Sequence, residues 1–490
     1  MKKKLLTMLA AILLAGTNAF AEAVEIDGIW YNLVSKAKVA EVTNPTPGYI
    51  NDNYTGAISI PEAVTYDGID YIVISIGDNA FGGCENVTSV TIPISVVSIG
   101  FSAFSYCSLE SITIPNSVTT IGNYAFGQCK SLTSITLPNS LSIIKATVFM
   151  DCSSLTSIII PNSVTGIQEY AFSKCGLRSI IIPNNVKYIS SRAFQYCGSL
   201  TSITIGSGVH SIGGEVFSHC PELTDVYCYA ENVPSTEGDA FDGSYIDCAT
   251  LHVPVASVET YKTREPWSGF DTIAAIINEN SSTPIPAGTY AKADLKRTFA
   301  EGWNTICLPF AIDNIEAAFG TGAKAYGFDD FADGELKFSQ VTSLAAGTPY
   351  VIYVPAEITE LIAFENINIE ESNTISSNID KNGACFRGTY APVAAGEWTK
   401  NNSTDNIYGI TPDGKIRKAG SEASILGLRA YFDIPAGTEV KGFVFEDEAT
   451  GIKTLSNPTI KGEDIYNLAG QRLNKAQKGI NIVSGKKVLY

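Results

Sequence analysis

Cysteine is the residue type whose spacing most strongly suggests chemistry in this sequence of 490 residues. Seven cysteines recur at intervals of 22 or 23 residues: Cys84, Cys107, Cys129, Cys152, Cys175, Cys197 and Cys220. Disulfides are one interpretation, but seven cysteines cannot all pair within one chain, and a buried ladder of small apolar thiols explains the same spacing. Cys228 and Cys248 lie outside the series and form a better candidate disulfide, while Cys307 and Cys385 stay unassigned.

Other chemistry-bearing motifs are missing from the sequence. It contains no C-x-x-C, no H-E-x-x-H and no G-x-x-x-x-G-K-[ST], so we expect no metal site and no cofactor. The three histidines, His210, His219 and His252, lie at variable turn or cap positions, and we expect no catalytic residue. The acidic stretch 329–335 departs from a calcium loop, and its Asp-Gly pair favours a hairpin turn.

Phenylalanine recurs with nearly the same period as cysteine. The series has intervals of 22 to 24 residues and runs through Phe81, Phe104, Phe126, Phe149, Phe172, Phe194, Phe217 and Phe241. A fixed period of this length is typical of a solenoid, in which each repeat contacts only its neighbours. We therefore expect both series to form structural ladders along the stack.

The consensus of the repeat is L-x-S-I-x-I-P-x-x-V-x-x-I-x-x-x-A-F-x-x-C. Apolar residues such as Ile112 and Ile114 alternate with polar ones, which is the period of a strand with one buried face. The proline that follows, as at Pro115, predicts the end of that strand. Stacked coils would place equivalent side chains about 4.8 Å apart, so the core is built by repetition.

This consensus resembles the BspA-type leucine-rich repeat of bacterial surface proteins over residues 55–275. The stretch from Leu251 to Trp267 resembles the closing unit of such arrays, where a short helix covers the last coil. The resemblance implies a non-enzymatic scaffold that binds extracellular proteins. It suggests host matrix proteins such as fibronectin and fibrinogen, or the surfaces of other bacteria, as partners.

Candidate contact residues are those that vary on a regular surface. Between the two inward isoleucines, most repeats carry Thr, but two adjacent repeats carry Ile159 and Ile181. Tyr106 and Tyr196 precede the cysteine of their repeats and are aromatic anchors of the kind that interfaces use. Ordinary packing of neighbouring side chains is the alternative explanation for all four residues.

Residues outside the repeats predict five further segments. Residues 1–21 have the basic start, the short apolar stretch and the A-F-A site of a signal peptide, and no later segment is long and apolar enough to cross a bilayer. We expect an N-terminal cap at 22–54, a linker at 276–286 and a β-sandwich-like module at 287–450. The basic end, 451–490, resembles the C-terminal sorting domain of type IX secretion substrates, although Asn481 stands where an aromatic residue is usual.

The module at 287–450 offers a second functional hypothesis. Its stretch Gly302 to Phe310 resembles a β module of large exported proteins of Gram-negative anaerobes, and Trp303 and Trp398 could stack on sugar rings. A glycan-binding accessory protein is therefore the alternative to protein adhesion.

Charge limits the partners. Residues 22–450 hold 23 Lys and Arg against 48 Asp and Glu, a net charge of −25. Such a surface repels phosphate, so nucleic acid and anionic membranes are poor candidates. The sequence predicts a mostly β protein, a leucine-rich-repeat solenoid followed by a β-sandwich-like domain and a short β segment. We expect it at the cell surface or outside the cell.

Overall fold

The computed structural model divides the chain into two compact units. Unit 1 comprises residues 1–253 and 257–273, and unit 2 comprises residues 254–256 and 274–490. The described residues are 23–45, 54–369, 375–394, 407–419, 424–435, 437–446, 453–455, 465–467, 472–473, 480–483 and 486–489. The predicted signal peptide and most of the predicted sorting domain lie outside these ranges. The boundaries drawn from the sequence remain predictions.

A small sheet begins unit 1 and covers the first coil. Its first five strands are β1 (Val24–Ile26), β2 (Ile29–Val34), β3 (Val39–Thr43), β5 (Ala63–Tyr66) and β6 (Ile69–Ile76). The sheet continues through β6 into β8 (Ser98–Ile99) and β10 (Thr120–Ile121) of the coils. The phenol of Tyr54 donates a hydrogen bond of 2.8 Å to the carbonyl of Thr43, and its ring lies 4.8 Å from that of Phe81. The sheet is therefore tied to the first member of the phenylalanine series.

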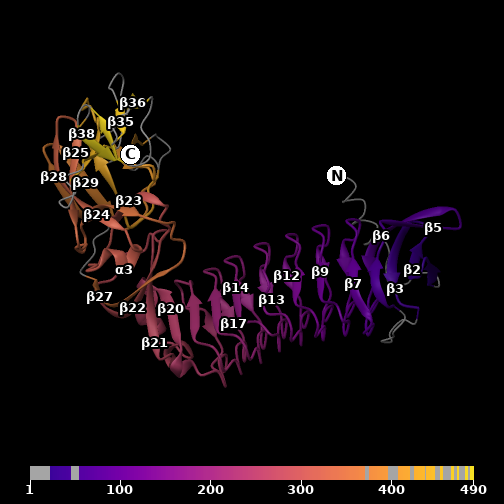
Figure 1. Cartoon of the computed structure of the whole chain (residues 1–490). Helices are drawn as coiled ribbons and strands as arrows, with labels where there is room; N and C mark the ends of the chain where they lie inside the picture. Colours follow the sequence, from indigo (N-terminus) through magenta and orange to yellow (C-terminus); the bar gives the residue numbers. More distant parts are fainter. Residues whose placement is uncertain are drawn as a thin grey trace. The chain divides into compact units, whose positions relative to one another are not determined.

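The first side of each coil carries the strand that the consensus predicts, and the coils stack one after another (Figure 1). These strands are β4 (Gly56–Ser59), β7 (Val87–Thr91), β9 (Ser111–Thr113), β11 (Ser134–Thr136), β14 (Ser179–Ile182), β16 (Ser202–Ile205), β18 (Asp225–Cys228) and β20 (Thr250–Pro254). Pairing is parallel and in register, so Ile112 faces Ile135, and Ile180 faces Ile203. The equivalent residues 156–160 keep alternate burial but form no regular strand, although the Arg178 N–H still donates to the Thr156 carbonyl.

A second, shorter strand follows in each coil, which the sequence analysis did not predict. The series is β8 (Ser98–Ile99), β10 (Thr120–Ile121), β12 (Ile143–Ile144), β13 (Gly166–Ile167), β15 (Tyr188–Ile189), β17 (Ser211–Ile212) and β19 (Ser235–Thr236). Its inward residue is the isoleucine of the V-x-x-I part of the consensus in every strand except β19, where Thr236 takes that position. Ile144, Ile167 and Ile189 pair in register.

The third side of each coil is a turn that also hydrogen-bonds to the next coil. In one coil, Ser102, Phe104 and Tyr106 donate backbone N–H groups to the carbonyls of Asn123, Ala125 and Gly127. The residues two before and two after each phenylalanine from Phe81 to Phe217 have positive φ, as at Ser102 (51°) and Tyr106 (60°). This left-handed conformation is costly for residues other than glycine, so the hydrogen bonds between coils must hold it.

The core of the solenoid is a stack of phenylalanine rings. Neighbouring rings from Phe81 to Phe241 lie 5.2–5.7 Å apart with interplanar angles of 4–21°. Trp267 and Phe270 meet the last ring edge-on at 5.5 and 5.3 Å. The closing segment that carries them contains η1 (Ile246–Cys248), η2 (Val255–Ser257), α2 (Val258–Tyr261) and η3 (Trp267–Gly269). These aromatic groups close the apolar end of the stack.

Unit 2 packs two sheets around an aromatic core. Phe328 and Phe338 of one sheet lie 5.8 and 5.9 Å from Phe432 of the other, and Phe386 stacks on Phe432 at 4.3 Å. The first sheet has the order β23-β26-β24-β25-β33-β34-β38-β37-β35-β36, and the second has the order β28-β29-β32-β30-β31. In addition, β22 pairs with β21 and β27.

The strands and helix of unit 2 have the following bounds: β21 (Thr272–Asn278), β22 (Gly288–Lys296), β23 (Gly302–Cys307), α3 (Ile315–Phe319), β24 (Lys324–Ala332), β25 (Glu335–Val341), β26 (Pro349–Val354), β27 (Ile362–Ile369), β28 (Ile375–Lys381), β29 (Ala384–Thr389), β30 (Ile407–Ile410), β31 (Ile416–Lys418), β32 (Arg429–Asp433), β33 (Gly442–Glu446), β34 (Lys453–Leu455), β35 (Ile465–Asn467), β36 (Arg472–Leu473), β37 (Ile480–Val483) and β38 (Lys486–Leu489). The Asp-Gly pair forms the expected hairpin turn between β24 and β25, because Asp333 and Gly334 both have positive φ.

Because every ring of the stack contacts two others, a truncation in its middle leaves a cavity that the neighbours cannot fill. We expect Phe149→Ala to lower the free energy of unfolding by about 3–5 kcal/mol. Urea unfolding of the full chain, followed by circular dichroism, measures this loss. Ile159→Thr in the next coil is the control and should change stability by less than about 1 kcal/mol, since its side chain is exposed. Equal losses would contradict the stacked core.

Candidate functional site

The sheet face is the outward row of side chains on the first series of strands. Its members are Thr91, Thr113, Thr136, Ile159, Ile181, Thr204, Tyr227 and His252. Ile159 is 85% exposed and Ile181 is 67% exposed, whereas their inward neighbours Ile158, Ile160 and Ile180 are buried. Because the two coils are adjacent, these aliphatic side chains form one apolar patch. Four of the other six members of the row are threonine.

On the coils next to this patch, threonine hydroxyl groups donate hydrogen bonds to backbone carbonyls of the preceding coil. Thr133 Oγ1 donates to the carbonyl of Glu110 at 3.0 Å, and Thr201 Oγ1 donates to the carbonyl of Arg178 at 3.0 Å. Such bonds tie one coil to the next. The neighbouring row positions Thr136 and Thr204 are polar, and the aliphatic patch is the distinctive feature of this part of the face.

Two further members of the sheet face were not singled out from the sequence. The rings of Tyr227 and His252 stack at 4.1 Å, and His252 Nε2 lies 3.1 Å from Asp225 Oδ1. The register β16-β18-β20 brings them into line with Thr204 and Ile181. Counting the period past Thr204 could have found Tyr227, but the repeat consensus is weakest there.

Tyr106 and Tyr196 lie in the turn of their coils and not beside the isoleucine patch. Tyr106 is 40% exposed and Tyr196 is 47% exposed. Each contacts an aromatic residue of the next coil: Tyr106 lies 6.1 Å from Tyr124, and Tyr196 lies 4.5 Å from His219, between ring centroids. The four candidates therefore belong to two surfaces. We call the second one the turn face, defined by the outward residues two before and two after each phenylalanine.

The cysteine series is a ladder of buried free thiols. Cys107, Cys129, Cys152, Cys175, Cys197 and Cys220 each donate a hydrogen bond of 3.0–3.5 Å to the carbonyl of a phenylalanine in the preceding coil. Burial raises the pKa of the Cys220 thiol to about 12, and it raises the pKa of Cys107 as well. Cys107 and Cys220 are therefore neutral at physiological pH, and the ladder as a whole fills space in the core.

The candidate disulfide between Cys228 and Cys248 is not formed. Both are free thiols, and Cys228 is buried with its Sγ 3.2 Å from the hydroxyl of Tyr261, whereas Cys248 is exposed. The closing segment is fastened by Tyr261, which also donates to the carbonyl of Ala230 at 2.9 Å. The prediction was wrong because a buried hydrogen bond holds the cap in place of a covalent staple.

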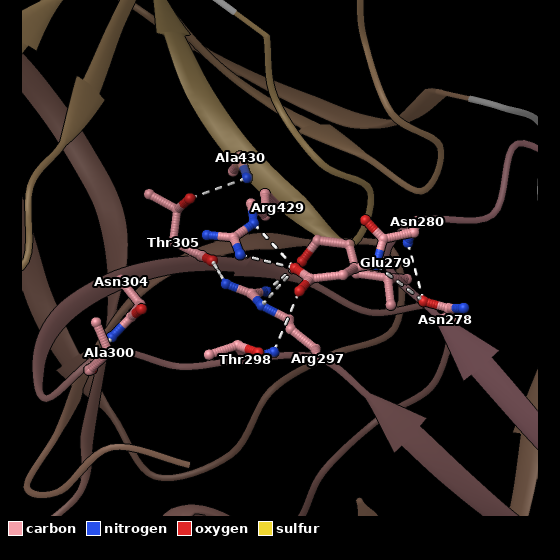
Figure 2. Close-up of polar contacts among 11 residues, drawn as sticks. Asn278, Glu279, Asn280, Arg297, Thr298, Ala300, Asn304, Thr305, Arg429 and Ala430 are labelled. Atoms are coloured by element: carbon pink, nitrogen blue, oxygen red, sulfur yellow. Dashed lines mark hydrogen bonds and ion pairs between the residues drawn. The ribbon is translucent and has the colours of Figure 1, made fainter. Parts of the chain in front are cut away.

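A buried charged cluster lies inside unit 2 and joins three segments (Figure 2). Glu279 accepts hydrogen bonds from Arg429 at 2.7 and 3.1 Å and from the backbone of Thr298 at 3.2 Å. Arg297 is fully buried, with its Nε 3.9 Å from Glu279, and its guanidinium donates to the carbonyls of Leu428 and Thr305. Burial lowers the pKa of Arg297. The partners of Glu279 and Arg297 all belong to unit 2, so the cluster has a structural role. We call it the charged clamp, because it holds three segments of unit 2 together.

Trp303 is a poor platform for a sugar ring. Its indole stacks on Phe445 with centroids 4.2 Å apart and an angle of 10°. Tyr326 and Tyr353 lie 5.5 and 5.4 Å away. Trp398, the other residue of the glycan hypothesis, lies outside the described residues.

Metal and membrane signatures are missing from the part of the chain that the structure describes. Within it, no three His, Cys, Asp or Glu side chains gather in a way that could hold a metal ion. No helix among the same residues is long and apolar enough to span a membrane.

The stacked coils, the parallel strands and the repeated apolar ladder define a leucine-rich-repeat solenoid. Residues 64–155 and 142–262 match the BspA type Leucine rich repeat region, in six copies. The segment 64–262 is thus a BspA-type repeat array, which confirms the resemblance and the mostly β fold. No curated protein matches the chain.

Solved structures of bacterial repeat proteins are similar to part of this chain. A leucine-rich repeat protein from Bacteroides ovatus ATCC 8483 is 23% identical, with 52% of this chain and 82% of that chain covered and a TM-score of 0.28. A leucine rich cell surface protein from Faecalibacterium prausnitzii A2-165 is 22% identical, with 52% and 94% covered and a TM-score of 0.31. The T. pallidum Leucine Rich Repeat protein is 28% identical, with 44% and 84% covered and a TM-score of 0.30.

Thiol accessibility tests the buried ladder. We expect a colorimetric disulfide reagent at pH 8 to label one cysteine rapidly in the native chain, Cys248, because the other ten are buried. All eleven should react in denaturant. Cys248→Ser should abolish the rapid phase, whereas rapid labelling of several cysteines in that variant would contradict a packed thiol ladder.

The charged clamp predicts a stability effect confined to unit 2. Glu279→Gln removes the only carboxylate beside Arg297 and Arg429 in the described contacts, and breaking such a buried pair costs about 3–5 kcal/mol. Hydrogen exchange of peptides from β29 and β32 during urea unfolding measures it. Asp413→Asn, which breaks the exposed pair with Lys415, should cost less than about 1 kcal/mol. A small loss for both variants would show that the clamp contributes little.

Proposed function

We propose that the repeat array is a protein-binding scaffold and that Ile159 and Ile181 on the sheet face contact its partner. The observation that carries the proposal is the exposure of these two adjacent aliphatic side chains, 85% and 67%, in a row where neighbouring coils place threonine. Replacing a threonine hydroxyl by an aliphatic group on a solvated sheet gives the fold no inward contact. A partner that covers the patch would remove apolar area from water.

The free energy expected from burying these two isoleucine side chains is large enough for them to dominate a small interface. Full burial of an exposed isoleucine side chain contributes about 1.5–3 kcal/mol. Two such side chains, side by side on a rigid sheet, would form the apolar centre of an interface, and the flanking Ser and Thr residues would form its polar rim. The rigid coils lower the entropic cost of binding, since the contact residues are already in place.

The proposed partners are extracellular proteins, either host matrix proteins or proteins on the surfaces of other bacteria. We propose export to the cell surface or the medium, which follows from the predicted signal peptide and from the BspA-type array. The proposed role is adhesion without catalysis. The alternative, glycan binding through the module at 287–450, has weaker support because the ring of Trp303 is covered on one face by Phe445.

The chain itself supplies a conservative test, because threonine is the residue that other coils use at this position. We expect the double variant Ile159→Thr/Ile181→Thr to keep its fold and to lose at least tenfold in affinity for its partner. The affinity is measured on immobilised matrix proteins and on whole bacterial cells, with circular dichroism as the check on folding.

The matched control is the double variant Thr91→Ile/Thr113→Ile, which adds isoleucines to two other adjacent coils of the same face and keeps Thr136 beside the natural patch. It should leave affinity at the natural patch unchanged. If the threonine variant binds as well as the natural chain, the sheet face is not the contact surface. If neither protein nor cell is bound while isolated glycans are, the alternative function replaces the proposal.

A further inference from the structure

The last coils of the array carry acidic side chains and no basic ones. Residues 193–261 contain no Lys or Arg, but they contain nine acids: Glu215, Glu222, Asp225, Glu231, Glu237, Asp239, Asp242, Asp247 and Glu259. Glu237, Asp239, Asp242 and Asp247 are exposed around the final turns. Glu215 is paired with Arg192, and Glu259 is paired with Lys262, but the stretch itself supplies no Lys or Arg for the exposed acids around the final turns.

Exposed aromatic rings accompany these acids. Tyr196 is 47% exposed and Tyr245 is 62% exposed. The ring of Tyr196 packs on that of His219, which lies over Gly243 so closely that an added Cβ would be 3.2 Å from the imidazole. The left-handed backbone at Tyr196 and His219, with φ of 58° and 56°, turns both side chains outward in fixed positions. The rings are thus pre-ordered before any partner arrives.

One cation already shows how the turn face holds positive charge. The guanidinium of Arg192 lies 5.5 Å from the ring centroid of Tyr170 and donates to the Tyr170 hydroxyl at 2.6 Å. It also donates to Glu215 Oε1 at 2.5 and 3.0 Å, and Gln195 steadies the same carboxylate at 2.5 Å. The guanidinium is therefore held by the ring and hydroxyl of Tyr170 on the preceding coil and by the carboxylate of Glu215 on the following coil. Beyond Arg192, rings and acids continue without a Lys or Arg until Lys262.

We infer that the turn face of the last coils, together with the adjoining exposed residues Glu237, Asp242, Tyr245 and Asp247, docks a Lys- and Arg-rich segment of a protein partner. Aromatic faces attract ammonium and guanidinium groups, and nearby carboxylates add to that attraction. The acids are distributed over three coils, which matches charges repeated along an extended basic segment. This surface is separate from the isoleucine patch, so its occupancy does not depend on the proposed function of the sheet face.

A labelled basic peptide tests the inference on the full chain. Fluorescence anisotropy with fluorescein-labelled nona-arginine should show saturable binding at low salt that weakens as salt increases, and nona-glutamate should not bind. Tyr196→Ser/His219→Ser should weaken binding about tenfold, since the cation–π contacts are lost. The triple variant Glu237→Gln/Asp239→Asn/Asp242→Asn should weaken binding by a similar factor. It should still fold, because Asp239→Asn keeps a side-chain oxygen that can accept the hydrogen bond from the backbone N–H of Glu215.

The matched control removes the same charge elsewhere. Glu62→Gln/Glu85→Gln/Glu110→Gln changes three exposed acids near the start of the array and should alter affinity less than twofold. Ile159→Thr/Ile181→Thr should also leave peptide binding unchanged. If the control triple weakens binding as much as the test triple, the attraction belongs to the net charge of the chain and the inference fails. It fails too if serine at both aromatic positions leaves the affinity unaltered in a folded protein.

Discussion

The solenoid depends on axial stacking of equivalent residues. Each coil is too short to bury its own apolar side, so the ring of Phe149 is buried only because Phe126 and Phe172 lie 5.7 and 5.3 Å on either side of it. Backbone hydrogen bonds between coils hold the same register on all three sides. The turn is the most constrained of these, because it keeps large residues such as Tyr106 at positive φ. Three hydrogen bonds to the next coil offset this backbone strain, and they repeat along the stack.

Because the inward side chains build the core, the outward positions are free to vary. Inward positions are nearly fixed as Ile, Val, Phe and Cys, and a change there disturbs two neighbouring coils. Outward positions on the sheet face and the turn face contact solvent, and that is where Ile159, Ile181 and Tyr196 depart from the pattern. The same logic explains the buried thiols, which fill a small inward position and donate to phenylalanine carbonyls. Adhesion and docking of a basic segment are therefore compatible on one scaffold, since they use different sides of the coil.

Much of the array could be predicted from the sequence because its period is explicit. The spacing of Phe and Cys predicts the ladders, and the alternation around Ile112 and Ile114 predicts the first strand of the coil. The second strand is only two residues long and leaves no alternation to detect. The partner of Tyr106 was missed because Tyr124 occupies another position of its repeat, and only the stacked register brings the two together. His219 occupies the same position as Tyr196, directly before the cysteine, so counting the period could have found that pair. The clamp in unit 2 joins Glu279 to Arg429 across 150 residues, a separation that no local pattern encodes.

Deletion of one complete coil tests the stacking claim most directly. Removing residues 153–175 joins Cys152 to Gly176 and leaves Phe149 next to Phe194 in an unbroken register, whereas removing only residues 153–163 shifts every later coil by half a period. If stacking of equivalent positions builds the core, urea unfolding followed by circular dichroism will show a cooperative transition for the first deletion and none for the second. Similar behaviour of the two deletions, whether both fold or both fail, would contradict the claim that the repeat register is the core.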